Sequence, residues 1–231
     1  MQIYTKISQV IHQNFEILNV LLRLLFSKLL NEILTMDQKP YAIYIHGVGS
    51  GAKSGTKSSL AHYFTEYEWI NPEVTHDPYE SIPLLNEWAK TFQPALIAGT
   101  SMGGLYTLYV DCPSAIKLAV NPAMNIETVL RKIGYGKYKY LCERENGETE
   151  YVIDEAMARR FIQFRNEHEI IKGVRNMAVF STADELVGRE NSKKSAAVLE
   201  KLDFEIYWYD KFGHRMNEQA AKKIVGWMRG A

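Results

Sequence analysis

Short apolar runs alternate with amphipathic segments along most of the chain. Runs of strand length lie at residues 41–46, 73–76, 95–98, 115–120, 177–181 and 204–210. Segments with helical spacing of apolar positions lie between and after them, at residues 58–67, 82–92, 105–109, 155–167, 191–202 and 216–227. Buried strands that alternate with helices are typical of a parallel sheet covered on both faces. The pattern therefore predicts an α/β fold whose functional residues lie at the carboxyl ends of the strands.

The alternation is interrupted between residues 125 and 172. Within this segment Asn146-Gly147 stands between two β-favouring runs, a strong signal for a β-hairpin. Residues 155–167 follow as a charged helix. The segment is interpreted as an insertion between two strands of the sheet, and a plain surface excursion is the alternative.

Residues 1–35 differ from the rest of the chain. The run from Val10 to Leu34 is rich in leucine and isoleucine but is interrupted by Arg23, Lys28 and Glu32. These charges disfavour a membrane span and a secretory signal. We expect a helical amino-terminal extension over residues 1–35 and one domain over residues 36–231. Alternatively, Met36 is the natural start of the chain and the leader is a start-site overread.

Composition narrows the classes of partner. The chain has 231 residues, of which 46% are hydrophobic, enough for one sizeable core. Its 27 basic and 27 acidic residues give formal net charge +0, so we expect no nucleic acid partner. Cys112 and Cys142 lack the spacing of a metal, redox or disulfide framework, which indicates a reducing, cytoplasmic location. No motif indicates a metal or cofactor.

The strongest chemical signal is Gly99-Thr100-Ser101-Met102-Gly103, between an apolar run and a helical segment. Gly-x-Ser-x-Gly between a strand and a helix is the nucleophile elbow of α/β-hydrolases, in which a sharp turn exposes the serine. Glycine is needed there because a Cβ would prevent the close approach of helix and strand. Ser101 is therefore the candidate nucleophile.

A serine nucleophile needs a general base, and α/β-hydrolases place their triad in the order serine, acid, histidine. Four histidines precede Ser101 and fail that order, namely His12, His46, His62 and His76. His168 lies in a charged helix, where a solvated surface role fits better. His214 directly follows the last strand, and Gly213 permits the bend that a base there requires. His214 is the candidate base.

The candidate acid is Asp184, at the end of the strand before last, with Glu185 as the neighbouring alternative. Successive side chains diverge, so only one of the two can address His214, and the other is expected to cap the following helix. An oxyanion hole needs two backbone N–H groups. We predict that Met102 supplies one and Val48, after the first strand, the other. His46 is interpreted as a hydrogen-bonding organiser of that loop.

Several motifs together resemble the YqiA/YcfP group of small α/β-hydrolase esterases. They are YIHGVGSGAKSGTKSSL, GTSMGG, AVNPAM, STADELV and FGH, and the resemblance covers residue 41 to the carboxyl terminus. It implies an α/β-hydrolase fold with a small cap insertion at about residues 125–172, where substrate selectivity is expected. It also implies a serine esterase with Ser101, Asp184 and His214 as triad, acting on carboxylic esters or acyl thioesters. The leader up to Thr35 and a longer insertion depart from the group.

Two other functions remain open from the sequence. Residues 47–54 approach the nucleotide-binding GxxxxGK[ST] pattern, but Ala52 replaces its second glycine. A P-loop-like nucleotide binder is therefore one alternative. A non-catalytic interaction protein on a hydrolase scaffold, using the amino-terminal helix, is the other.

Overall fold

The computed structural model of the protein describes residues 21–28 and 39–230. Contacts divide the chain into two units, Met1–Lys39 and Pro40–Ala231. In the first unit, residues 21–28 are helical and expose several leucine side chains. The remainder of the helix predicted over residues 10–34, and Met36, lie outside the described residues. Within the part described, no helix has the length and hydropathy needed to cross a membrane.

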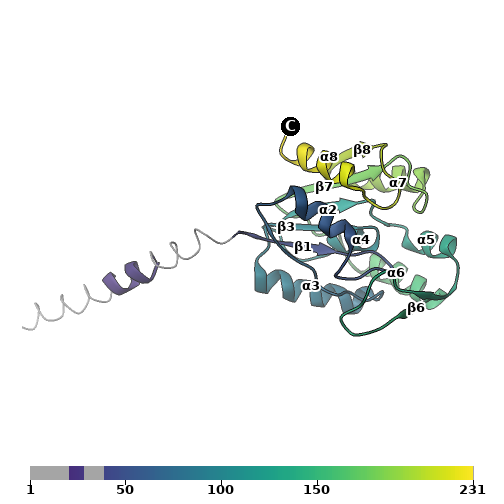
Figure 1. The fold of residues 1–231 in the computed structure, drawn as a ribbon, viewed down its shortest axis with the longest axis horizontal. Coiled ribbons are helices and arrows are strands. Elements are labelled where there is room, and N and C mark those ends of the chain that lie inside the picture. Colours follow the sequence, from purple (N-terminus) through teal and green to yellow (C-terminus); the bar gives the residue numbers. More distant parts are fainter. Residues whose placement is uncertain (1–20, 29–38, 231) are drawn as a thin grey trace, which may run out of the picture. The chain divides into compact units, whose positions relative to one another are not determined.

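A parallel sheet of six strands forms the centre of the second unit (Figure 1). In spatial order the strands are β2 (Glu68–Ile70), β1 (Tyr41–Ile45), β3 (Leu96–Thr100), β4 (Ile116–Val120), β7 (Arg175–Ser181) and β8 (Glu205–Tyr209). The registers align their carboxyl ends, since Ile45 pairs with Gly99 and Thr100 pairs with Val120. The predicted parallel sheet is confirmed.

Helices cover both faces of the sheet, as predicted. Figure 1 shows α2 (Gly55–Tyr63) and α8 (Glu218–Met228) on one side, where they pack with Ala42 and Tyr44 of β1. The opposite face, which includes Ile43, is covered by α3 (Pro78–Phe92), α4 (Met102–Thr107), α5 (Ile126–Ile133), α6 (Glu155–Glu167) and α7 (Arg189–Glu200). Alternate residues of β1 thus enter two different cores, because successive side chains of a strand point to opposite faces.

The insertion between β4 and β7 consists of α5, an antiparallel hairpin and α6. The hairpin pairs β5 (Gly136–Lys139) with β6 (Glu150–Ile153), so the predicted hairpin is present. Its connection is longer than the Asn146-Gly147 signal suggests and spans residues 140–149, which we call the hairpin loop. Gly147, with φ 76°, forms only a local turn inside this loop, where its N–H donates to the carbonyl of Arg144 at 3.1 Å.

The prediction of a strand at residues 73–76 is wrong. The second strand is β2, which pairs with residues 41–43 of β1 at the edge of the sheet. In the segment after it, side chains accept the backbone N–H groups. Val74 donates to the His46 ring at 3.2 Å and Thr75 donates to Ser81 Oγ at 3.0 Å. These hydrogen bonds replace a strand ladder and hold the segment as a loop.

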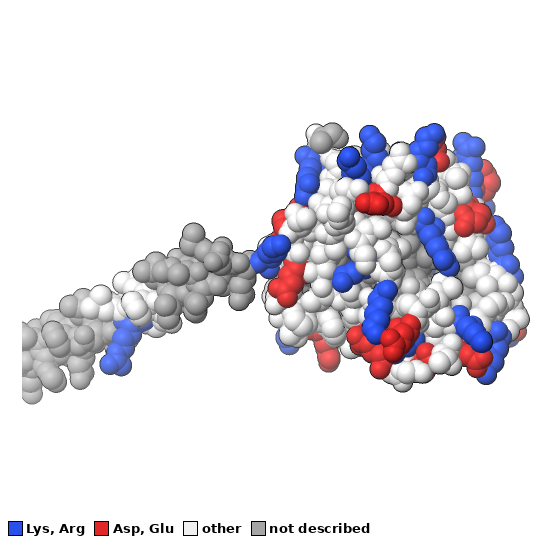
Figure 2. Space-filling view, in the orientation of Figure 1, with Lys and Arg blue, Asp and Glu red and all other residues white. Residues whose placement is uncertain are grey.

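Charged side chains of both signs are interspersed on the face drawn in Figure 2. This agrees with the formal net charge of +0. Among the described residues of that face, no single sign of charge forms a broad surface of the kind that binds a phosphate backbone.

Candidate active site

Ser101 lies at a sharp turn between β3 and α4. Its backbone has φ 61° and ψ −117°, a conformation that is strained for a residue with a Cβ. A Cβ on Gly99 would overlap the backbone of Gly103, and a Cβ on Gly103 would overlap the carbonyl of Ile45. The two flanking glycines therefore allow the turn, as the Gly-x-Ser-x-Gly motif predicts.

His214 and Asp184 come together at the carboxyl end of the sheet. The ring nitrogen Nδ1 of His214 lies 3.0 and 2.9 Å from the two carboxylate oxygens of Asp184. Both residues are buried, with exposed fractions of 7% and 4%. The backbone N–H groups of Leu186 and Val187 also donate to Oδ1 of Asp184, each at 2.9 Å. A carboxylate at Nδ1 keeps the proton there and leaves Nε2 able to accept one.

Glu185 has a different partner from Asp184. Its Oε2 accepts the backbone N–H of His214 at 2.8 Å. A Cβ on Gly213 would lie 2.7 Å from the same oxygen, so a larger residue there would require the Glu185 side chain to shift. The side chains of these two adjacent residues therefore point in different directions, as expected, but both carboxylates accept hydrogen bonds from His214. The expectation that the second one caps a helix is wrong, because Gly188 occupies the N-cap of α7.

Asn121, which was not predicted as a site residue, supports the His214 loop. Its Nδ2 donates to the carbonyls of Gly213 and His214 at 3.2 and 3.1 Å, and its Oδ1 accepts the N–H of Ser181 at 2.7 Å. Asn121 is fully buried and adopts φ 44°, which asparagine tolerates better than most residues. The available signal was an asparagine in an Asn-Pro pair directly after a buried strand.

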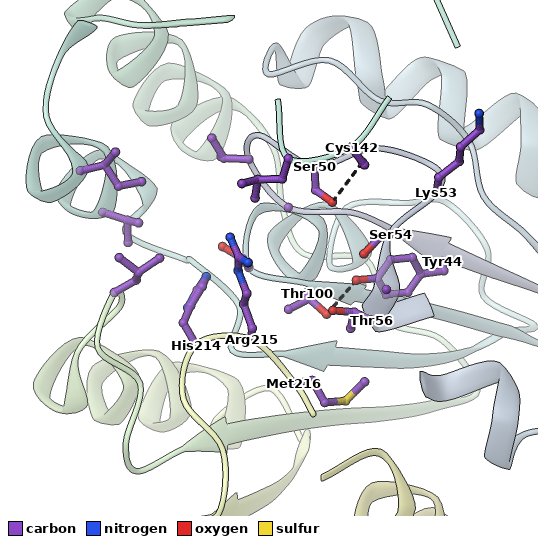
Figure 3. Close-up of a pocket in the computed structure, with 18 of the residues that line it drawn as sticks. Tyr44, Ser50, Lys53, Ser54, Thr56, Thr100, Cys142, His214, Arg215 and Met216 are labelled. Carbon is purple, nitrogen blue, oxygen red and sulfur yellow. Dashed lines mark hydrogen bonds between the residues drawn. The ribbon is translucent and has the colours of Figure 1, made fainter. Parts of the chain in front are cut away.

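Ser101 and His214 line one cavity of about 450 Å³ (Figure 3). Within the described residues, no hydrogen bond joins the two side chains. Apolar side chains from the insertion and the β7–α7 connection form one part of the lining: Ile126, Val129, Ile133, Leu141 and Leu186. Besides Ser101, the lining includes five hydroxyl-bearing side chains, Tyr44, Ser50, Ser54, Thr56 and Thr100. The cavity thus combines apolar and polar surfaces around the serine.

The polar part contains a buried tyrosine. The hydroxyl of Tyr44 donates to Thr100 Oγ1 at 3.2 Å, and Figure 3 shows this pair below Ser54 and Lys53. Burial raises the pKa of Tyr44, although hydrogen bonds with neighbouring hydroxyls act in the opposite direction. Tyr44 therefore stays protonated at neutral pH and offers no general base.

Of the two predicted oxyanion donors, Met102 directly follows Ser101 in the chain and Val48 lines the same cavity as Ser101. Met102 is the first residue of α4, where a backbone N–H has no intrahelical acceptor. Val48 lines the cavity, and a Cβ on the preceding Gly47 would lie 3.2 Å from the Cβ of Ser101. The peptide between residues 47 and 48 is therefore close to Ser101. Among the described residues, no three His, Cys, Asp or Glu side chains gather as a metal ion would require.

This sheet order, the serine turn and the histidine after the last strand define an α/β-hydrolase fold, and comparison with solved structures agrees. The mouse alpha/beta hydrolase domain-containing protein 10 superposes with a TM-score of 0.62 at 11% identity, over 84% of this chain and 89% of that one. Est1E from Butyrivibrio proteoclasticus superposes with a TM-score of 0.62 at 17% identity, over 84% of this chain and 88% of that one. A monoacylglycerol lipase from Paleococcus ferrophilus superposes with a TM-score of 0.60 at 15% identity, over 84% of this chain and 96% of that one. At these identities the likeness shows the fold alone.

Residues 41–222 match the profile of the uncharacterised protein family UPF0227. The chain belongs to this family, and the predicted resemblance to the YqiA/YcfP group is confirmed. Comparison with curated proteins gives no significant match.

Proposed function

We propose that this protein is a serine hydrolase that cleaves carboxylic esters or acyl thioesters through an acyl-serine intermediate. One observation carries the proposal: His214, which is paired with the buried Asp184, lines the same cavity as Ser101, and Ser101 occupies a strained strand-to-helix turn. Structural neighbours named as an esterase and a monoacylglycerol lipase support the same reaction class.

In the proposed first step, Ser101 Oγ attacks the carbonyl carbon of the substrate and His214 Nε2 takes its proton. Asp184, at Nδ1, stabilises the imidazolium that forms. The hydrogen bond between serine and histidine is expected to form when the substrate binds, because such contacts often tighten only in the complex.

The negative oxygen of the tetrahedral intermediate needs donors that are already in place. The N–H groups of Met102 and Val48 are proposed for this role, since one begins α4 and the other lines the cavity beside Ser101. Return of the proton from His214 to the leaving group breaks the ester bond. Water, activated by His214, then releases the acid and regenerates Ser101.

The lining of the cavity suggests the substrate class. Five aliphatic side chains, contributed mainly by α5 and the hairpin loop, form a surface that fits an apolar acyl chain. The hydroxyl-bearing side chains, with Lys53 and Arg215, suit a polar alcohol or thiol portion. We therefore propose a small-molecule ester or thioester with an apolar acyl group as the partner of this site.

The decisive experiment is steady-state hydrolysis of a panel of p-nitrophenyl esters and acyl-CoA thioesters, together with labelling by a fluorophosphonate probe. The wild-type protein is expected to turn over at least one substrate and to be labelled, and Ser101→Ala is expected to lose both. Matching circular dichroism spectra would show that the variant folds. A wild-type protein that is neither labelled nor active on the panel would favour the non-catalytic interaction protein.

A further inference from the structure

A second buried histidine, His46, lies directly under the loop that carries Val48. His46 follows β1, has an exposed fraction of 1%, and its Nδ1 lies 3.0 Å from the carbonyl oxygen of Gly47. The same oxygen accepts the N–H of Ser50 at 3.2 Å. Two donors therefore hold the carbonyl of the peptide that joins residues 47 and 48.

The orientation of this peptide decides where the Val48 N–H points. In a trans peptide the carbonyl and the following N–H point in opposite directions. With the Gly47 carbonyl held by His46, the Val48 N–H faces away from His46, and Gly47 and Val48 line the cavity whereas His46 does not. A flip of this peptide would break both hydrogen bonds to the carbonyl and would turn the N–H away from the cavity.

His46 can hold the carbonyl only if its proton is on Nδ1. Two groups that are always donors surround Nε2: the N–H of Val74 at 3.2 Å and the guanidinium of Arg144, whose Nη1 lies at 3.3 Å. Both require Nε2 to be unprotonated. The contacts at Nε2 therefore select the neutral tautomer that donates from Nδ1 to Gly47.

The carboxylate of Glu73 favours the other tautomer, in which the proton is on Nε2. Its Oε1 lies 3.0 Å from Nε2 of His46, where a carboxylate favours a proton, and it also contacts the Arg144 guanidinium. Burial acts to raise the pKa of Glu73, but the N–H of Glu145 and the charge of Arg144 act to lower it, and the pKa lies below its usual value. Glu73 is therefore ionised, and Arg144 is the cation that neutralises it and keeps the Nε2 proton away.

Arg144 comes from the hairpin loop and is almost completely buried, with an exposed fraction of 4%. Besides His46 and Glu73, its guanidinium donates to the carbonyls of Ser50 and Val74, each at 3.0 Å. It thus contacts both residues, His46 and Ser50, that hold the Gly47 carbonyl. Its side chain also lies over the ring of Tyr140, 4.6 Å from the centroid.

We propose that Arg144 is a positioning residue that sets the tautomer of His46 and thereby aims the Val48 N–H at the developing oxyanion. This inference rests on the proposed hydrolase function and extends it, because it makes the insertion part of the oxyanion hole. Arg144 is not among the residues that line the cavity. It acts through His46 and through the loop of residues 47–50.

The first test compares Arg144→Met with Arg165→Met on the best p-nitrophenyl ester. Arg165 also lies in the insertion and pairs with Glu127, so its loss loosens the insertion without touching His46. Removal of one oxyanion donor costs roughly 100- to 1000-fold in kcat, and a misaimed donor costs less, so Arg144→Met should lower kcat by roughly 10- to 100-fold with little change in KM. Arg165→Met should lower Tm but keep kcat within about threefold of wild type. Similar small losses of kcat in both variants would overturn the proposal.

The second test is a double-mutant cycle with His46→Gln. If Arg144 acts through His46, Arg144→Met should cost little further kcat in the His46→Gln background, because coupled residues are not additive. Arg144→Lys keeps the charge and should recover part of the lost kcat. Independent, multiplying losses from the two positions would contradict the proposed route.

The third test uses the wild-type protein, so it depends neither on the folding of an Arg144 variant nor on a known substrate. Nitrogen-15 spectra of histidine-labelled protein report which ring nitrogen carries the proton, and His46→Gln identifies the signal. We expect the Nδ1–H tautomer for His46 in the wild-type protein, and the opposite tautomer there would refute the inference even if the enzyme is active. Conversely, an Nδ1–H signal in a protein inactive on every ester would leave the geometry standing and remove only the hydrolase function.

Discussion

Two buried histidines lie beside carboxylates at the carboxyl end of the sheet, but they use their rings differently. His214 holds Asp184 with Nδ1, and within the described residues no hydrogen bond engages its Nε2. Nδ1 of His46 lies 3.0 Å from a backbone carbonyl oxygen, and its Nε2 faces the N–H of Val74, the guanidinium of Arg144 and the carboxylate of Glu73. His214 lines the cavity, whereas His46 is not among its lining residues.

The comparison separates two demands on a histidine. A general base must keep one nitrogen available, and a positioning residue is most rigid when both nitrogens are engaged. The supports differ as well. Asn121 and Glu185 hold the backbone around His214, and both come from the carboxyl ends of sheet strands. His46 depends on Arg144, which comes from the insertion.

The largest expected effect follows from breaking the His214 pair. Asp184→Asn can stabilise the wrong tautomer of the ring and leaves the imidazolium without its counter-charge, so kcat should fall by roughly 10⁴-fold. Steady-state kinetics on the best ester measures the loss, and a thermal melt checks the fold. If kcat stays within tenfold of wild type, Asp184 is not the acid of a triad.

The next largest effect is a loss of stability at acid pH, which we expect from the partly buried His76 near His46. His76 lies on the His46 side, where its Nε2 faces the N–H of Gly49 at 3.4 Å and its ring stacks on Tyr140. Burial, with the charge of Arg144 adding to it, lowers the pKa of His76 from 6.5 to about 4. Between these two values the unfolded chain binds a proton that the folded protein does not. Stability present above pH 6.5 is therefore lost as pH falls towards 4, by up to about 3 kcal/mol.

His76→Phe should remove most of this slope, because the ring remains and the titrating nitrogen does not. Urea unfolding of both proteins at pH 7 and pH 4.5 gives the difference directly, and every other group cancels in the comparison. Equal losses in the two proteins would show that His76 titrates normally in the fold.

Removing the Asn121 side chain, which holds the backbone around His214, should have a smaller effect on kcat than Asp184→Asn. Asn121→Ala leaves the N–H of Ser181 and two loop carbonyls without partners, so the free energy of unfolding should fall by about 2–3 kcal/mol and kcat by about tenfold. Asn176→Ala is the matched control, since the side chain of Asn176 hydrogen-bonds Gly173, and neither residue lines the cavity. A loss of stability in both variants without a fall in kcat for Asn121→Ala would make Asn121 purely structural.

The smallest effect is expected at Glu185. Glu185→Gln keeps an oxygen that can accept the His214 N–H, so kcat should change by only about two- to fivefold, against roughly 10⁴-fold for Asp184→Asn. The two substitutions are adjacent and chemically identical, and the same assay compares them. A larger loss at Glu185 than at Asp184 would reverse the assignment of the acid.

Features set by local pattern were predictable from the sequence. The strand-to-helix turn at Ser101 follows from its two glycines, and α6 occupies the predicted residues 155–167. His214 and Asp184 follow from chain order and strand ends, and the structure brings them within hydrogen-bond distance. The failure at residues 73–76 has a physical reason: a short apolar pattern does not reveal that side chains distant in sequence satisfy its backbone.

Residues whose role depends on distant partners could not be predicted. Arg144 lies in a charged stretch that is typical of a solvent-exposed loop, yet it is buried against Glu73, which precedes it by 71 residues. Asn121 bonds residues about 60 and 90 positions away. No periodicity or spacing encodes such contacts, because they arise only when the sheet brings the strand ends together.

The hairpin loop also meets residues 47–53 through Leu141, whose N–H donates to Gly49 at 2.8 Å, and through the Lys53–Glu143 pair. Grafting this loop between homologues, a common route to new selectivity in enzyme engineering, would therefore exchange part of the cavity lining and the contacts of residues 47–53 in one operation. Libraries that randomise the loop should keep the arginine at position 144 constant, so that gains in specificity are not masked by collapse of turnover.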